Sequence, residues 1–407
     1  MRFLFALFLF LSASNGAAQP VPWPRAVAEF TSAAEVEAAA ISFPNSANMQ
    51  RRRIVAALEA RDGAAALDAT RRLAAMGATL SPPSRALVAP LVGAGPIAAL
   101  APVFDANAAP VAGSVAYARI GADQHLVEGL IWNAGSRRLY ATTVVGRRLL
   151  ELRPDGAHVV LEGGLGSLFG GATDPARPLL WISSAMMEQT PPGPGFTGLL
   201  AVDPANPAAA RRIAAPAGAT PGDAAIGPDG IVYVSDGMNG AVYRCPPGCT
   251  MLETWLPAGT FHSAQGMAFS ADGRLLYVAD YRYGLAVVER ASGHVFRMNA
   301  PPALMLDGID GLVRDGDSLV AIQNGAPPLR IIALALSRDG FGITALRVIE
   351  RNNPAWGEPS LGVVIGDRLV YVSNPQWDRY GPGGVVTGEG PTQPTEIRAI
   401  QLRRMPR

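Results

Sequence analysis

Acidic and amide side chains recur at one position of a repeated segment. Glu128, Asp223, Gln265 and Asp310 each stand directly before a Gly or Ala that continues into a short apolar run. Carboxylate and amide oxygens are hard ligands that suit Ca²⁺, Mg²⁺ or Mn²⁺. If these positions converge, the sequence predicts a divalent metal site made from all four residues.

A second interpretation of the same residues stays open. Asp and Glu at the start of a strand often accept hydrogen bonds from a turn and face water. Repetition at the same place in several segments favours the metal site, because isolated turn residues have no reason to recur in register.

Two histidines share a spacing with this pattern. His125 and His262 stand three residues before Glu128 and Gln265. A neutral imidazole is a competent base near pH 7, so either residue could take a proton from an attacking water. His262 is the first candidate catalytic residue and His125 the second; the alternative is that both are polar surface residues.

The elements that position these residues are β-hairpins. Ser263–Asp280 contains two runs of strand-forming residues separated by an Asp-Gly turn. Similar segments begin near Glu128, Gly170, Asp223, Asp310 and Leu361, at intervals of about 40–50 residues, as in four-stranded propeller blades. We therefore expect a mainly β fold, a six-bladed β-propeller over residues 103–407.

In such a fold the hairpins would begin on the innermost strands. Their strand-start positions would then surround one mouth of the central channel: Glu128, Phe169, Asp223, Gln265, Asp310 and Leu361, with Glu358 just upstream of the last. The segments Ala116–Ile120 and Thr395–Leu402 are expected to pair as strands and close the ring.

The N-terminal part follows other patterns. Residues 1–18 contain one Arg, an apolar run and small residues at the end, which is typical of a signal peptide and predicts export, to a bacterial periplasm or as a secreted protein. Residues 19–102 have helical periodicity and predict a tetratricopeptide-like αα-hairpin. One such unit cannot bury both its faces, so we expect it to pack on the propeller; binding of a protein partner is the alternative.

Composition excludes several functions. The formal net charge is +1 and 16% of residues are charged, which argues against a nucleic-acid partner, and no membrane span is expected after removal of the signal peptide. The sequence contains no Lys, which removes Schiff-base chemistry and Walker-type phosphate binding. Asn324 and Asn374, which follow second strands, are expected to satisfy turn backbones.

The two cysteines, Cys245 and Cys249, flank a Pro-Pro-Gly loop. In an exported chain this spacing favours a local disulfide. A metal site is the weaker alternative, because two thiolates leave the coordination incomplete.

Three segments resemble one known family. Leu126–Trp132, Ser263–Asp280 and Gly308–Val313 are similar to blades of the gluconolactonase and senescence-marker-protein family of regucalcin-like six-bladed propellers. The resemblance covers about two thirds of the chain. It implies one divalent cation that polarises a lactone or ester carbonyl, with Glu128 and Asp310 matching the family's Glu and Asp ligands.

The other two ligand positions depart from the family. Gln265 stands where the family has Asn, and Asp223 stands at the second Asn position. Two functions therefore remain open: a divalent-metal-dependent hydrolase of a lactone or related ester, and a non-catalytic propeller that binds a small molecule or a protein.

Overall fold

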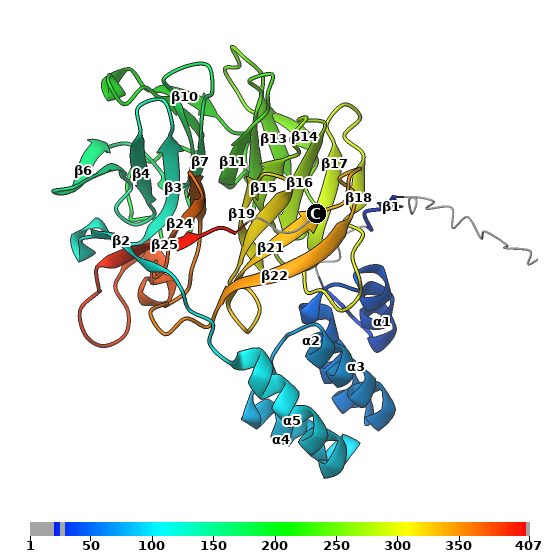
Figure 1. Ribbon diagram of the computed structural model, residues 1–407. Helices are drawn as coiled ribbons and strands as arrows, with labels where there is room; N and C mark the ends of the chain where they lie inside the picture. Colours follow the sequence, from blue (N-terminus) through cyan, green and yellow to red (C-terminus); the bar gives the residue numbers. More distant parts are fainter. Residues whose placement is uncertain (1–19, 25–28, 404–407) are drawn as a thin grey trace, which may run out of the picture.

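The computed structural model describes residues 20–24 and 29–403. Five helices at the N-terminal end are followed by a mainly β region of small antiparallel sheets (Figure 1). The predicted signal peptide, residues 1–18, lies outside the described residues. None of the helices in the described ranges is long and apolar enough to cross a membrane.

All six predicted hairpins form, and each supplies the first two strands of one sheet. Sheets 1 to 3 consist of β3 (Val127–Asn133), β4 (Arg138–Thr143), β5 (Leu149–Arg153) and β6 (Gly156–Leu161); β7 (Ser167–Thr173), β8 (Leu180–Ala185), β9 (Gly198–Val202) and β10 (Arg211–Ala214); and β11 (Pro221–Ile226), β12 (Val232–Asp236), β13 (Val242–Cys245) and β14 (Glu253–Leu256).

The other three sheets each hold a hairpin in the same way. Sheets 4 to 6 consist of β15 (Ala264–Phe269), β16 (Leu275–Asp280), β17 (Gly284–Glu289) and β18 (Val295–Arg297), with β1 (Val21–Pro22) added at the edge; β19 (Ile309–Asp315), β20 (Ser318–Gln323), β21 (Arg330–Leu336) and β22 (Ile343–Arg351); and β23 (Gly362–Ile365), β24 (Arg368–Val372), β25 (Thr395–Gln401) and β2 (Val115–Ile120). Short 3₁₀ turns occur at η1 (Ala122–Gln124), η2 (Pro207–Ala209), η3 (Trp377–Arg379) and η4 (Pro382–Gly384).

The first strands of the sheets face one another. In chain order each packs against the next, from β3 through β7, β11, β15 and β19 to β23, and β23 also packs against β3. Second strands such as β16 are buried over their whole length, because apolar clusters fill the space between neighbouring sheets. Burial on both faces explains why these strands are continuous apolar runs and do not alternate.

The two ends of the β region pair with each other. β2 lies antiparallel to β25, with Val115 opposite Ala399 and Ile120 opposite Thr395. β25 in turn pairs with β24, so the last sheet combines strands from both ends of the region. These are the two segments whose pairing the sequence predicted.

The helical region is larger than one αα-hairpin. Its helices are α1 (Ala33–Ser42), α2 (Ala47–Ala60), α3 (Gly63–Ala75), α4 (Pro82–Val92) and α5 (Ala94–Ala108). The predicted boundary at residue 102 is too early, since α5 continues to Ala108 with Pro102 inside it. The alanines around this boundary are the strongest helix formers, which explains why the helix continues past it.

This region packs against the sheets, as expected for a unit with too small a core of its own. Ile54, Leu73 and Phe104 share one apolar cluster with Met305 and Ala326 of the β region. The Asn45 amide donates hydrogen bonds to the carbonyls of Pro301 and Leu304 at 2.7 and 2.8 Å. The helices therefore lie beside sheets 4 and 5 (Figure 1).

The predicted local disulfide is confirmed. Cys245, the last residue of β13, is bonded to Cys249 across the Pro-Pro-Gly loop, with their Cα atoms 5.5 Å apart.

Candidate functional site

Carboxylates from several sheets meet at the start of the first strands. Glu128 is on β3, Asp223 on β11, Asp310 on β19, and Glu358 precedes β23. We call these four residues the acidic cluster. They are near enough to influence one another, since Asp310, Asp223 and Glu358 all raise the pKa of Glu128.

Burial is the main cause of these shifts, and repulsion between carboxylates adds to it. Burial followed by Asp310 raises the pKa of Asp223 well above its ordinary value. Burial also raises the pKa of Asp310 to about 6, which a hydrogen bond from Asn324 partly opposes and Glu358 reinforces. The ionised cluster is thus electrostatically unfavourable in the absence of a positive charge.

Hydrogen bonds orient two of the carboxylates and use one oxygen of each. Trp377 Nε1 donates to Glu128 Oε2 at 2.8 Å, and Asn324 Nδ2 donates to Asp310 Oδ2 at 2.7 Å. The Tyr281 hydroxyl donates to Asn324 Oδ1 at 2.8 Å and fixes that amide. Within the described ranges, the second oxygen of each carboxylate accepts no side-chain hydrogen bond.

Close contact between the first strands explains the glycines that follow these residues. A Cβ on Gly129 would lie 2.8 Å from the carbonyl oxygen of Phe169 on β7, and one on Gly266 would lie 2.5 Å from the carbonyl oxygen of Asp310 on β19. Only glycine allows neighbouring first strands to approach so closely. The recurrent acid-glycine or amide-glycine pairs therefore reflect packing around a common centre.

Gln265 lies at the start of β15, at the equivalent position of its sheet. Its Nε2 donates to Ser263 Oγ at 2.9 Å, while within the described residues Oε1 accepts no hydrogen bond. The orientation leaves a carbonyl oxygen as a potential metal ligand, although the longer side chain departs from the family pattern.

The two histidines make other contacts. The backbone N of His262 donates to Asp280 Oδ2 at 2.7 Å, and its ring meets the edge of Tyr283. His125 Nδ1 lies 3.4 Å from the Tyr380 hydroxyl, with the backbone at φ 52°. Within residues 20–24 and 29–403, neither imidazole is hydrogen-bonded to the acidic cluster.

The environment of His262 favours the neutral form. Burial lowers its pKa first, and the positive charges of Arg282 and Arg52 lower it further. Arg52 belongs to α2, so the helical region contributes to the electrostatics around this histidine. A neutral imidazole is the form required of a general base.

The cluster has the donor chemistry and the charge that suit a divalent cation. Among the described residues, no arginine forms an ion pair with Glu128, Asp223, Asp310 or Glu358. Equally, no three His, Cys, Asp or Glu side chains of that part of the chain are already gathered at metal-binding distance. The oxygen donors therefore fit a cation, but a preassembled ligand set is not present.

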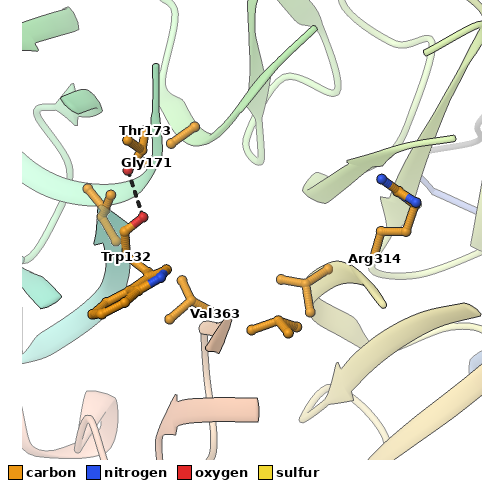
Figure 2. A pocket seen from close by; sticks show the side chains of 9 residues that line it. Trp132, Gly171, Thr173, Arg314 and Val363 are labelled. Carbon is orange, nitrogen blue, oxygen red and sulfur yellow. Dashed lines mark hydrogen bonds between the residues drawn. The ribbon is translucent and has the colours of Figure 1, made fainter. Parts of the chain in front are cut away.

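A cavity of about 220 Å³ lies further along the same first strands (Figure 2). Thr173 Oγ1 donates to the carbonyl of Trp132 at 2.8 Å on one side, and Arg314 stands across the cavity. The strands rise about 3.3 Å per residue, so Trp132 and Arg314 lie about 13 Å along them from Glu128 and Asp310. The lining residues are Ile131, Trp132, Gly171, Ala172, Thr173, Val313, Arg314, Val363 and Val364.

Sequence reasoning missed part of the site. Asn324 was expected to satisfy a turn, but its side chain instead binds Asp310 and the carbonyl of Pro359. Trp377, in the segment that follows β24, was not assigned a role and contacts Glu128. The position of Asn324 in the sequence could have indicated this role. Asn324 follows the second strand of its hairpin, and that strand ends beside the start of the first strand, where Asp310 lies.

Comparisons with known proteins found matches among solved structures only. No protein-family model matches the chain, and no curated protein matches it in sequence. A gluconolactonase from Xanthomonas campestris aligns over 72% of this chain and 99% of its own, with 19% identity and a TM-score of 0.48.

Other solved structures align over a similar span. Regucalcin from Agrobacterium tumefaciens, described as calcium-binding, has 17% identity and a TM-score of 0.46, covering 72% of this chain and 97% of its own. A putative oxidoreductase (glucose dehydrogenase) from Thermus thermophilus has 14% identity and a TM-score of 0.47, covering 71% and 100%.

Proposed function

We propose that the six sheets form a closed six-bladed propeller and that the protein is an exported, divalent-metal-dependent hydrolase of a lactone or related ester. The observation that carries this proposal is the acidic cluster. Carboxylates from different sheets converge with no described arginine to neutralise them. Such an arrangement is costly unless a cation balances it, which favours metal binding over a purely structural role.

The proposed ligands are Glu128, Asp223, Gln265 and Asp310. Trp377 and Asn324 each donate a hydrogen bond to one oxygen of Glu128 and of Asp310, which supports the proposal that the other oxygen of each carboxylate binds the ion. A Ca²⁺, Mg²⁺ or Mn²⁺ ion bound there would polarise the carbonyl of a lactone or ester. We propose a lactone as the substrate because three sequence segments resemble the gluconolactonase family. We propose hydrolysis as the reaction because of the metal site.

Proton transfer is assigned to His262, with His125 as the second candidate. Burial, Arg282 and Arg52 keep the His262 imidazole neutral at physiological pH, so it can accept a proton from water. Asp280 fixes the backbone of His262 through a 2.7 Å hydrogen bond, which limits the movement of the loop that carries the ring.

Metal binding is tested by melting temperature with Ca²⁺, Mg²⁺ or Mn²⁺ and with a chelator. We expect the ion to raise the melting temperature, because it binds only the native arrangement. Glu128→Gln and Asp310→Asn should abolish the rise while leaving a folded protein. Asp229→Asn is the matched control, since Asp229 lies in the exposed β11–β12 turn and should not affect metal binding.

Hydrolysis is tested with aldonolactones, acyl-homoserine lactones and aryl esters. Turnover that requires the ion and is lost in Glu128→Gln supports the hydrolase. A protein that binds no divalent ion contradicts the proposed mechanism. The lack of a preassembled ligand set favours the second candidate, a non-catalytic propeller that binds a small molecule, and metal binding without turnover of any substrate would support it.

A further inference from the structure

A second cavity lies between sheets 4 and 5, away from the acidic cluster. We propose that it binds a small organic anion that carries carboxylate and hydroxyl oxygens. Its volume is about 890 Å³. Nothing in this proposal depends on the metal site or on hydrolysis.

The cavity opens at the ends of the strands opposite to the acidic cluster. It is bordered by the β15–β16 turn at Ser270–Gly273, by the β19–β20 turn at Gly316 and Asp317, and by the β21–β22 turn at Ser337–Gly340. Leu402 and Arg403, which follow β25, complete the border. Gln265 and Asp310 stand at the starts of β15 and β19, so the two sites are at different ends of the same strands.

Two buried polar atoms in the cavity wall lack partners. The Tyr277 side chain is fully buried, yet its hydroxyl makes no hydrogen bond to any described residue. The same is true of Arg347 Nε, although another nitrogen of that guanidinium donates to the carbonyl of Arg403 at 2.6 Å. Buried donors without acceptors are costly, so both atoms are suited to an acceptor that the described residues do not supply.

A second buried tyrosine in an equivalent kind of position has the hydrogen-bond partners that Tyr277 lacks. Tyr371, on the second strand of sheet 6, is as deeply buried as Tyr277. Its hydroxyl donates to Glu350 Oε2 at 2.6 Å and lies 2.9 Å from Ser114 Oγ. The hydroxyl of Tyr371 is therefore satisfied by Glu350 of β22 in the neighbouring sheet 5, whereas Tyr277 lines the cavity.

Gly340 maintains the space beside the Tyr277 hydroxyl. Its backbone has φ +81°, which favours glycine, and a Cβ there would lie 2.8 Å from the hydroxyl oxygen. A larger residue would fill the gap next to this donor.

The aspartates of the two long turns are already satisfied. The hydroxyl of Ser270 donates to Asp272 Oδ1 at 2.6 Å, and that of Ser337 donates to Asp339 Oδ1 at 2.5 Å. Each aspartate also accepts a backbone N–H of its own turn. These acids therefore serve the turns through one oxygen each, and Asp272 also forms an ion pair with Arg274 at 3.6 Å.

Arginines outnumber acids in the lining. Four aspartates line the cavity, namely Asp272, Asp315, Asp317 and Asp339, against five arginines, namely Arg274, Arg314, Arg338, Arg347 and Arg403. Guanidinium groups bind carboxylates through charge-assisted hydrogen bonds. The lining thus carries one more positive than negative charge, which favours an anion with acceptor oxygens over a neutral sugar.

The test uses isothermal titration of the full-length protein, freed of metal, with L-malate as the probe and erythritol as a neutral four-carbon control. We expect malate to bind and erythritol not to bind. Tyr277→Phe removes only the hydroxyl and should weaken malate binding by about tenfold without lowering the melting temperature. Arg347→Gln should weaken binding by at least as much.

Two controls separate this site from the rest of the molecule. Tyr140→Phe changes a tyrosine at the equivalent place of β4 and should leave malate binding unchanged; Tyr140 pairs with Ile131 as Tyr277 pairs with Ala268. Glu128→Gln, in the acidic cluster, should also leave it unchanged. No binding of malate, equal binding by Tyr277→Phe, or equal binding of erythritol would each overturn the proposal.

Discussion

The carboxylate of Asp307 accepts a hydrogen bond of 2.9 Å from the backbone N of Ala47, the first residue of α2. Its other oxygen accepts one of 2.8 Å from the backbone N of Asn48. Asp307 belongs to the loop before β19, so a residue of the β region caps a helix that lies more than 250 residues earlier in the chain. The negative charge of Asp307 also lies next to the positive N-terminal end of the α2 dipole, which stabilises the helix.

Asp307→Ala should weaken the attachment of the helices. The substitution leaves buried N–H groups at the start of α2 without an acceptor, and we expect a loss of about 2–3 kcal/mol in the free energy of unfolding. Urea denaturation measures the loss, and limited proteolysis should show faster cleavage within residues 29–108.

Asp62→Ala is the control for this effect. Asp62 caps α3 by accepting hydrogen bonds from Ala64 and Ala65, but it is exposed and does not contact the sheets. The change should cost about 1 kcal/mol without releasing the helical region. Equal proteolysis of the two variants would show that Asp307 does not anchor the helices.

The disulfide should make a measurable contribution to stability. Replacing both Cys245 and Cys249 with Ser removes a crosslink that closes a short loop, which predicts a loss of about 2 kcal/mol. Thermal unfolding of the wild type under reducing conditions should reproduce the same decrease. If the variant had the same melting temperature as the oxidised wild type, the other contacts of the loop alone would be sufficient to hold it.

The acidic cluster predicts a dependence of stability on pH in the metal-free protein. Burial raises the pKa of Asp310 from 3.8 to about 6, so its protonated form is favoured by folding. The resulting stabilisation is complete below the ordinary pKa and is lost as the pH rises through about 6. The Asp310→Asn variant has no ionisable group at this position, so it should not show this loss of stability.

The comparison is made in chelator between pH 5 and pH 8. At pH 8 the Asn variant should be more stable than the wild type by roughly 1–2 kcal/mol, and the difference should shrink toward pH 5. A saturating divalent ion should reverse the order at pH 8. A difference independent of pH would mean that Asp310 is not part of a repulsive cluster.

Periodicity predicted the β region well because each hairpin carries its own signal. The turns and apolar runs around Glu128 and Gln265 are local, and their shared register implied a shared environment. The partners of Glu128 and Asp310 were not predictable in this way, since Trp377 and Asn324 come from segments without a repeated pattern. The unsatisfied hydroxyl of Tyr277 depends on the packing of two sheets, which no local pattern encodes.

The helical region shows the same division. Spacing predicted helices there but only one αα-hairpin, whereas the described residues form five helices. The strand β1 consists of Val21 and Pro22 alone and forms only because the edge strand β18 is available. A two-residue strand has no periodicity to detect. Its existence is a property of the sheet that it joins.

The assignment of His262 as the base can be tested separately from metal binding. His262→Gln should lower kcat/KM for the best lactone by about 10²–10⁴-fold and leave the metal-dependent rise in melting temperature intact, because the imidazole transfers a proton and is not a ligand. His125→Gln should have a smaller effect, and His158→Gln, at an exposed residue on β6, should have none. The wild-type pH profile should show its acidic limb below the ordinary histidine pKa of 6.5, since burial, Arg282 and Arg52 lower the pKa of His262. Arg52→Gln removes one of those charges and should move the limb to higher pH. Full activity in His262→Gln, or a limb that Arg52→Gln does not move, would assign the proton transfer to another group.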